Sequence, residues 1–180
     1  MNKILSASLS LGLVLLLSVF FSFQTPSEWF LGGNAAKSYQ MGKDISTKDG
    51  TVVYHLKSVD SLITGFGTVM NYMDPKPYLG KRVRMTGMLK TLDVKDWSGF
   101  WLRIDEKDSR LPLGFDNMHD GRTDRSIRGT SDWNRYEIIL DVPKESYKMA
   151  YGGIITGVGQ IWFKDIKFEI IDKSIRITGR

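Results

Sequence analysis

The sequence predicts an all-β domain, a two-sheet antiparallel β-sandwich, preceded by an apolar N-terminal signal or anchor helix. Runs of alternating apolar and polar residues recur along the chain, separated by turn signals rich in Gly, Pro, Asn and Asp. Aromatic and β-branched residues are frequent, and no convincing amphipathic helix follows the N-terminal segment. The 180 residues suffice for one domain with its own core.

The N-terminal segment, residues 1–27, differs in composition from everything after it. The run Ile4–Phe23 is uncharged, and as a helix it would extend about 30 Å, the thickness of a bilayer core. We expect a cleaved signal peptide or a retained membrane anchor. The small residues Thr25 and Ser27 favour cleavage, although no Ala-x-Ala site is present. With Lys3 on the inner side, the body is expected to be extracytoplasmic, either secreted or tethered to the membrane.

Composition narrows the function classes. The chain has no cysteine, which excludes disulfides, thiolate metal sites and a lipidated cysteine after the apolar run. The net charge is +5, but the charges are interspersed, with no block of five like charges. We therefore expect no nucleic-acid partner.

The sandwich is expected to occupy residues 28–172, and residues 173–180 form a polar C-terminal tail that is expected to fray. About eight strands fit the pattern, and a jelly roll is the favoured topology because it packs that number around one core. The predicted strands are 51–59, 66–73, 82–90, 100–105, 111–115, 136–142, 149–156 and 160–171.

Two irregular places stand out in this pattern. Residues 116–132 form a polar loop, which is long for a connection without secondary structure. In the last strand, Ile161 and Phe163 differ in phase from Ile166 and the apolar residues after it. A β-bulge near Lys164 and Asp165, or a strand start buried on both faces, would explain that change.

Short motifs between residues 78 and 171 occur in an order that resembles a known bacterial domain. They are "YLGKRVRMTGMLKT", "WSGFWLRID", "LGFDNM", "DRSIRGTSDWNRYEIILDVP" and "GQIWFKDIKFEI". The stretch resembles the jelly-roll domain attached to some helix-turn-helix transcription factors of the arabinose-regulator type. More loosely, it is similar to the galactose-binding-like sandwiches that serve as carbohydrate-binding modules. The segment "WFLGGNAAKSYQMGKD" is a plausible first strand of the same domain.

The sequence departs from that pattern in two places. The family loop usually reads Asp-Arg-Pro-Ile, whereas Ser126 replaces the proline here and residues 119–123 lengthen the loop. A signal or anchor is expected where the regulators carry a helix-turn-helix, so the resemblance implies the sandwich and not DNA binding.

The first candidate ligand site lies on one strand face. Trp101, Arg103 and Asp105 alternate with the apolar residues Phe100, Leu102 and Ile104. An indole platform beside a guanidinium and a carboxylate suits a sugar or another polar ligand. The alternative is a cross-strand ion pair on a solvated face, with Trp101 packed under a loop.

Three further residues are candidates for ligand binding. Asp116 and Asn117 open the long loop, where Asx side chains more often cap turns. Trp133 either packs over the end of the sandwich or stands at a binding rim. The related sandwiches often hold a structural calcium between the first and last strands, for which Glu28 and Asp165 are the candidates.

No catalytic motif is present, since the sequence lacks a Gly-x-Ser-x-Gly elbow, a His-Glu-x-x-His pair and a Walker loop. We expect no enzyme and no cofactor beyond a possible structural calcium. The favoured function is an exported, non-catalytic binding module for a carbohydrate or a similar polar molecule. The alternatives are a structural or protein-interaction module of the cell envelope without a small ligand and, third, a hydrolase.

Overall fold

The computed structural model describes residues 28–119 and 124–180 and is nearly all β. The predicted signal or anchor segment therefore lies outside the described residues. Nine strands pair with one another, and every pairing is antiparallel. The elements are β1 (Phe30–Gly32), 3-10 helix η1 (Ala36–Ser38), β2 (Tyr39–Ile45), β3 (Val52–Ser58), β4 (Phe66–Met73), 3-10 helix η2 (Lys76–Tyr78), β5 (Lys81–Glu106), β6 (Pro112–Asp116), β7 (Ile127–Val142), β8 (Ser146–Thr156) and β9 (Gln160–Ile171).

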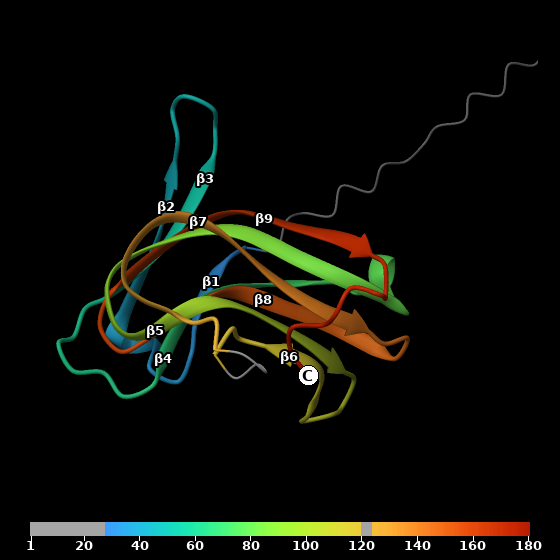
Figure 1. Ribbon diagram of the computed structural model, residues 1–180. Helices are drawn as coiled ribbons and strands as arrows, with labels where there is room; N and C mark the ends of the chain where they lie inside the picture. The colour runs from blue at the N-terminus through green and yellow to red at the C-terminus, as the bar shows by residue number, and fades with distance from the viewer. Residues whose placement is uncertain (1–27, 120–123) are drawn as a thin grey trace, which may run out of the picture.

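The pairings arrange the strands in two layers that share β5. The first layer runs β1-β4-β8-β5-β6, using the second half of β5, residues 97–106. The second layer runs β7-β5-β9-β3-β2, using the first half of β5, residues 81–92. Figure 1 shows β9 of the second layer above β8 of the first.

Strand β5 corrects the prediction of two separate strands at 82–90 and 100–105. It stays extended for 26 residues, because the segment between its halves keeps pairing partners on β7. The register with β7 shifts three times between Leu89 and Ser98, and Asp93 has φ = 51°. These irregularities bend the strand, so that one element passes from one layer to the other.

The core lies between the layers and is built from the predicted faces. Phe100, Leu102 and Ile104 of β5 are buried there, together with Ile138, Leu140 and Val142 of β7. The alternation of these strands predicted both faces correctly.

Several boundaries differ from the prediction. The sandwich has nine strands rather than about eight: two predicted strands merge into β5, while the segment before residue 51 contains the two strands β1 and β2 with η1 between them. Strand β7 begins at Ile127, so the loop predicted over residues 116–132 is shorter than expected. Residues 127–131, of which Ile127 is buried in the core, are extended because they pair with the bent part of β5.

The predicted bulge in the last strand is confirmed. Thr86 and Met88 of β5 face Lys167 and Lys164 of β9, so β9 contains one extra residue there. Asp165 lies in this insertion with φ = 56°. The bulge returns Ile166 and Phe168 to the core side, which explains the change of phase.

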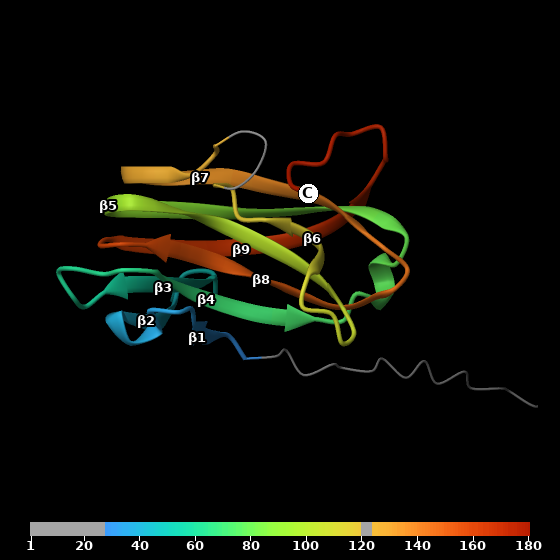
Figure 2. The ribbon, with the colours of Figure 1, turned by 90° about the horizontal axis from the view of Figure 1, so that it is seen from below.

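The C-terminal tail does not fray as expected but packs on the sandwich. Arg180 exchanges two backbone hydrogen bonds with Phe115 of β6, and the Thr178 amide donates to the carbonyl of Ile139 on β7. Figures 1 and 2 both place the C-terminus beside β6. Buried Gly179 leaves no room for a side chain, since a Cβ there would lie 2.3 Å from the Phe115 carbonyl oxygen. Backbone hydrogen bonds therefore hold the C-terminal tail in place, although its sequence is largely polar.

Among residues 28–119 and 124–180, no helix has the length and apolar character needed to cross a membrane.

Candidate binding site

A small hydrophobic cluster lies outside the main core, on the outer face of the first layer. Trp101, Ala150 and Ile154 are its buried members, contributed by β5 and β8. Partly buried side chains surround them: Phe66, Met70, Trp97 and Phe115. A contiguous apolar cluster on an outer sheet face, rather than between sheets, is typical of a binding surface.

A pocket of about 460 Å³ lies over this cluster, within the size range of small-molecule sites. Four neighbouring strands of the first layer supply most of its wall. The lining residues are Gly33, Phe66, Thr68, Met70, Tyr72, Trp101, Arg103, Asp105, Phe115, Lys148, Ala150 and Ile154. The pocket therefore has an apolar floor and a few charged groups at its rim.

The Trp101 ring is held in place by a buried hydrogen-bond chain. Its Nε1 donates to the hydroxyl of Thr68 at 2.7 Å, and that hydroxyl donates to the Gly153 carbonyl at 2.8 Å. Trp101 is only 8% exposed, so its indole N–H is used internally. The ring thus forms a rigid apolar wall rather than a free hydrogen-bond donor.

The charged rim consists of Arg103, Asp105 and Lys148. Arg103 Nε donates to Asp105 Oδ1 at 2.6 Å, and the side chains are 38% and 13% exposed. The Lys148 ammonium lies 4.6 Å from the centre of the Tyr72 ring, in a cation–π contact. Arg103 Nη2 also donates to the Arg110 carbonyl at 3.4 Å, so the guanidinium is held on two sides, and its other N–H groups and the Lys148 ammonium face a ligand in the pocket.

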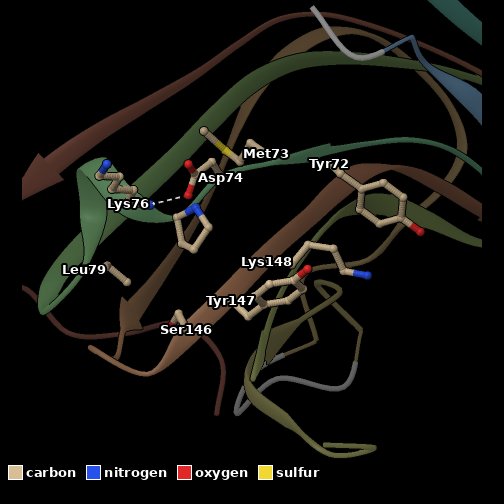
Figure 3. Close-up of a pocket in the computed structure, with 9 residues that line it drawn as sticks. Tyr72, Met73, Asp74, Lys76, Leu79, Ser146, Tyr147 and Lys148 are labelled. Carbon is tan, nitrogen blue, oxygen red and sulfur yellow. Dashed lines mark hydrogen bonds between the residues drawn. The ribbon is translucent and has the colours of Figure 1, made fainter. Parts of the chain in front are cut away.

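A second pocket of about 500 Å³ adjoins the first and shares Tyr72 and Lys148 with it. Figure 3 shows Tyr72 and Lys148 near one end of this pocket and Asp74 and Lys76 at the other. The Lys76 amide donates to Asp74 Oδ1 at 2.9 Å, which caps the turn after β4. Ser146 lines the pocket at 8% exposure, and among the described residues its buried hydroxyl has no hydrogen-bond partner. The two pockets adjoin one another across β4 and β8, and we call the first of them, over Trp101, the groove.

Three of the predicted ligand residues meet in the first pocket, and the others do not. Trp101, Arg103 and Asp105 all line it. Asp116 and Asn117 are buried and accept hydrogen bonds from the amides of Met118 and His119. Both side chains cap turns, as Asx residues at such positions usually do, and their assignment as ligand residues stays a prediction.

Trp133 lies apart from the other candidates. It belongs to β7 in the second layer, and Lys164 Nζ lies 5.0 Å from the centre of its ring in a cation–π contact. Trp133 and Trp101 therefore lie in different layers, and a role for Trp133 at a binding rim stays a prediction.

In the described residues, the candidate calcium ligands Glu28 and Asp165 are not part of a larger group of acidic side chains. Glu28 is exposed just before β1, and exposed Asp165 lies in the β9 bulge. Across residues 28–119 and 124–180, no three or more His, Cys, Asp or Glu side chains gather where they could hold a metal ion. The structural calcium stays a prediction.

Strand β4 lines the first pocket, a role that was not predicted from the sequence. Phe66, Thr68, Met70 and Tyr72 share one face by simple alternation, and this face forms a wall of the pocket. The alternation of β4 was visible in the sequence, but the sequence did not show which strand pairs with β4 or in which register. Met70 and Trp101 both lie opposite Gly152, and that pairing brings the two strands together.

The comparisons with known proteins agree with this architecture. No family model matches the sequence. The chain is 36% identical over 153 residues to an uncharacterized HTH-type transcriptional regulator, YbfP, of Bacillus subtilis. The match includes 84% of this chain and 50% of the regulator, so the chain spans about half the length of that curated relative.

Solved structures show the fold. The family 11 carbohydrate-binding module of a cellulosomal cellulase from Clostridium thermocellum superposes with a TM-score of 0.50 at 10% identity, covering 84% of this chain and 91% of the module. The enzymatically active domain of the bacteriophage CBA120 tailspike protein 4 gives a TM-score of 0.55 at 12% identity, covering 79% of this chain and 19% of that one. The resemblance to a regulator-attached sandwich and to carbohydrate-binding modules is confirmed. At these identities, the structural matches establish fold and not function.

Proposed function

We propose that this protein is a non-catalytic carbohydrate-binding module with jelly-roll topology. Its ligand site is the groove over β4, β8 and the second half of β5. The observation that carries the proposal is the apolar cluster around Trp101, which lies on an outer sheet face under a pocket of about 460 Å³. Carbohydrate-binding modules are among the solved structures that share the fold, which supports the same ligand class.

The lining suits a sugar chemically. Apolar walls from Phe66, Phe115 and Trp101 can pack against the C–H faces of a pyranose ring, since aromatic side chains combine apolar area with tolerance of partly wet sites. Arg103 and Lys148 supply N–H donors for hydroxyl or carboxylate oxygens of the ligand. Because Arg103 is held by Asp105, its donors are positioned before the ligand arrives.

The lining supports binding rather than hydrolysis. A glycosidase uses two carboxyl groups on either side of the scissile bond. Among the described residues that line the first pocket, Asp105 is the one carboxylate, and it is ion-paired with Arg103. No histidine, and no nucleophile beside a base, stands with it in that lining.

The proposal includes an extracytoplasmic location, because Ile4–Phe23 has the length and composition of a signal or anchor. Regulator YbfP is described as a transcription factor, and such proteins act inside the cell. We assign no DNA-binding role, since the described part of the chain contains no α-helix that could form a helix-turn-helix. Cell fractionation with protease accessibility tests this point: an intact, protease-protected chain in the cytosol would refute export.

Affinity electrophoresis through gels containing soluble polysaccharides tests the binding function. The full chain is kept in a detergent without a sugar headgroup, so that the detergent cannot occupy the groove. We expect one neutral or acidic polysaccharide class to retard the protein, and Arg103→Gln with Lys148→Gln to abolish the retardation. Lys107→Gln with Lys144→Gln, which removes the same charge at two exposed positions outside the groove, serves as the matched control. If no polysaccharide retards the chain while an envelope protein binds it, the function is protein interaction instead.

A further inference from the structure

The outer face of the second layer carries two tryptophans and two lysines in one row. Lys164 Nζ lies 5.0 Å from the ring centre of Trp133, and Lys90 Nζ lies 5.6 Å from that of Trp162. We name Trp133, Lys164, Lys90 and Trp162 the tryptophan–lysine row.

Strand pairing sets the spacing of the row. Lys90 on β5 faces Trp162 on β9, and β7 with Trp133 pairs with the other edge of β5. The two tryptophans therefore lie on strands two positions apart, about 10 Å across the sheet. Both tryptophans are half-buried, and so are Lys90 and Lys164.

A hollow of about 260 Å³ lies beside this row, between β5 and the β9 bulge. Arg135, Asp165 and Lys167 line it together with Thr86, Gly87 and Met88. Gly87 contributes only its backbone to the hollow, because a Cβ there would point to the core side and meet Phe100 and Ile166. The row thus borders a depression rather than a flat face.

The charge of this region is positive and largely uncompensated. In the described part of the chain, none of the four cations Lys90, Lys164, Arg135 and Lys167 forms a salt bridge. The nearby carboxylates are Asp165, which lines the hollow, and Asp49, whose charge interacts with that of Lys164. The neighbouring Arg84 differs, because Glu137 and Glu169 hold it at 3.0 Å and 3.1 Å. A positive face that includes indole rings favours an anionic ligand with apolar surface.

We propose that this face binds an acidic polysaccharide, a sugar polymer that carries carboxylates, independently of the groove on the first layer. Each lysine ammonium offers donors to a carboxylate, and the adjacent indole packs against the sugar's C–H groups. The face and the groove lie on opposite layers, so both can be occupied together. One domain then bridges two glycan chains.

A membrane surface fits this face less well. An anionic membrane would need apolar side chains that insert between lipids, whereas both tryptophans are half-buried in the sheet.

The test is isothermal titration of the full chain with polygalacturonate and with its fully methyl-esterified form, which keeps the polymer but removes the charge. We expect polygalacturonate alone to bind, with an affinity that falls steeply between about 50 and about 500 mM salt. The double variant Lys90→Gln/Lys164→Gln is expected to bind about tenfold more weakly or worse, which corresponds to about 1.4 kcal/mol.

The matched control, Lys107→Gln/Lys144→Gln, removes the same charge from exposed positions elsewhere and is expected to stay within about twofold of the wild type. An equal loss in the control would overturn the proposal, because net charge alone would then explain binding. So would equal binding of the esterified polymer, no binding of polygalacturonate, or tighter binding of single-stranded DNA or anionic vesicles. The Arg103→Gln variant separates the two sites, since it is expected to leave polygalacturonate affinity unchanged.

Discussion

Replacing Asp116 by Asn is expected to destabilise the fold while leaving glycan affinity unchanged. Its side chain is 0% exposed, and it joins the end of β6 to the segment before β7. Oδ1 accepts the Met118 amide at 2.7 Å, while Oδ2 accepts a charged hydrogen bond from the Arg125 guanidinium. Arg125 also donates to the Glu137 carbonyl at 2.7 Å, so the carboxylate helps to connect the loop to β7.

The magnitude follows from what Asn can replace. Its carbonyl oxygen can still accept the Met118 amide, but its amide group then faces the Arg125 guanidinium, donor against donor. Losing a hydrogen bond to a charged group costs about 1.5–3 kcal/mol. Because Arg125 is 25% exposed and partly hydrated, we expect about 2 kcal/mol. For a chain of this size the melting temperature would fall by about 4–8 °C.

Urea unfolding followed by tryptophan fluorescence measures this loss. Asp60→Asn, an exposed change between β3 and β4, is the control and is expected to stay within about 0.5 kcal/mol of the wild type. Arg125→Met tests the partner, and Asp116→Asn/Arg125→Met is expected to cost less than the sum of the single changes, because the two groups interact. An Asp116→Asn protein as stable as the control, or one that loses glycan affinity while stability is unchanged, would refute the reasoning.

Three further outcomes are expected. Gly179→Ala places a Cβ 2.3 Å from the Phe115 carbonyl oxygen and should cost about 1–3 kcal/mol in urea unfolding; a neutral result would mean that the tail does not pack there. Trp101→Phe removes the hydrogen bond to Thr68 and should cost about 1 kcal/mol while weakening glycan binding, which calorimetry would detect; unchanged affinity would exclude this wall from the site. Burial raises the pKa of Tyr39 to about 12, with the Asp96 charge adding to the rise. Because its folded-state pKa lies above the unfolded value of about 10, the stabilisation is complete below pH 10 and is lost as the pH rises towards 12. Tyr39→Phe should therefore lose less stability than the wild type over that window, and identical pH profiles would contradict the assignment.

Alternation along single strands was enough to predict the faces of the sandwich. Phe100 and Trp101 were assigned to opposite sides of β5, and the structure places one in the core and the other in the pocket. The change of phase after Phe163 likewise predicted the bulge, because one inserted residue reverses every later side chain.

Features that depend on pairing between distant segments could not be predicted in this way. Alternation does not show which strands are neighbours, so it could not show that Trp133 and Trp101 belong to different layers. Residues 127–131 and the tail are held by backbone hydrogen bonds. The pattern of side chains does not reveal such bonds, so the sequence predicted irregular structure in both segments. The β4 face was visible, but its role depended on its register with β8.

The central claim is that the groove over the first layer binds a glycan. The most direct measurement is thermal unfolding of the full chain against a panel of mono- and oligosaccharides, with calcium and with chelator, for the wild type and for Arg103→Gln. A ligand that binds only the native state raises the melting temperature by mass action. We expect a dose-dependent rise of the melting temperature with one sugar class in the wild type, and no such rise in Arg103→Gln. No rise with any sugar, or a rise that Arg103→Gln keeps in full, would contradict it.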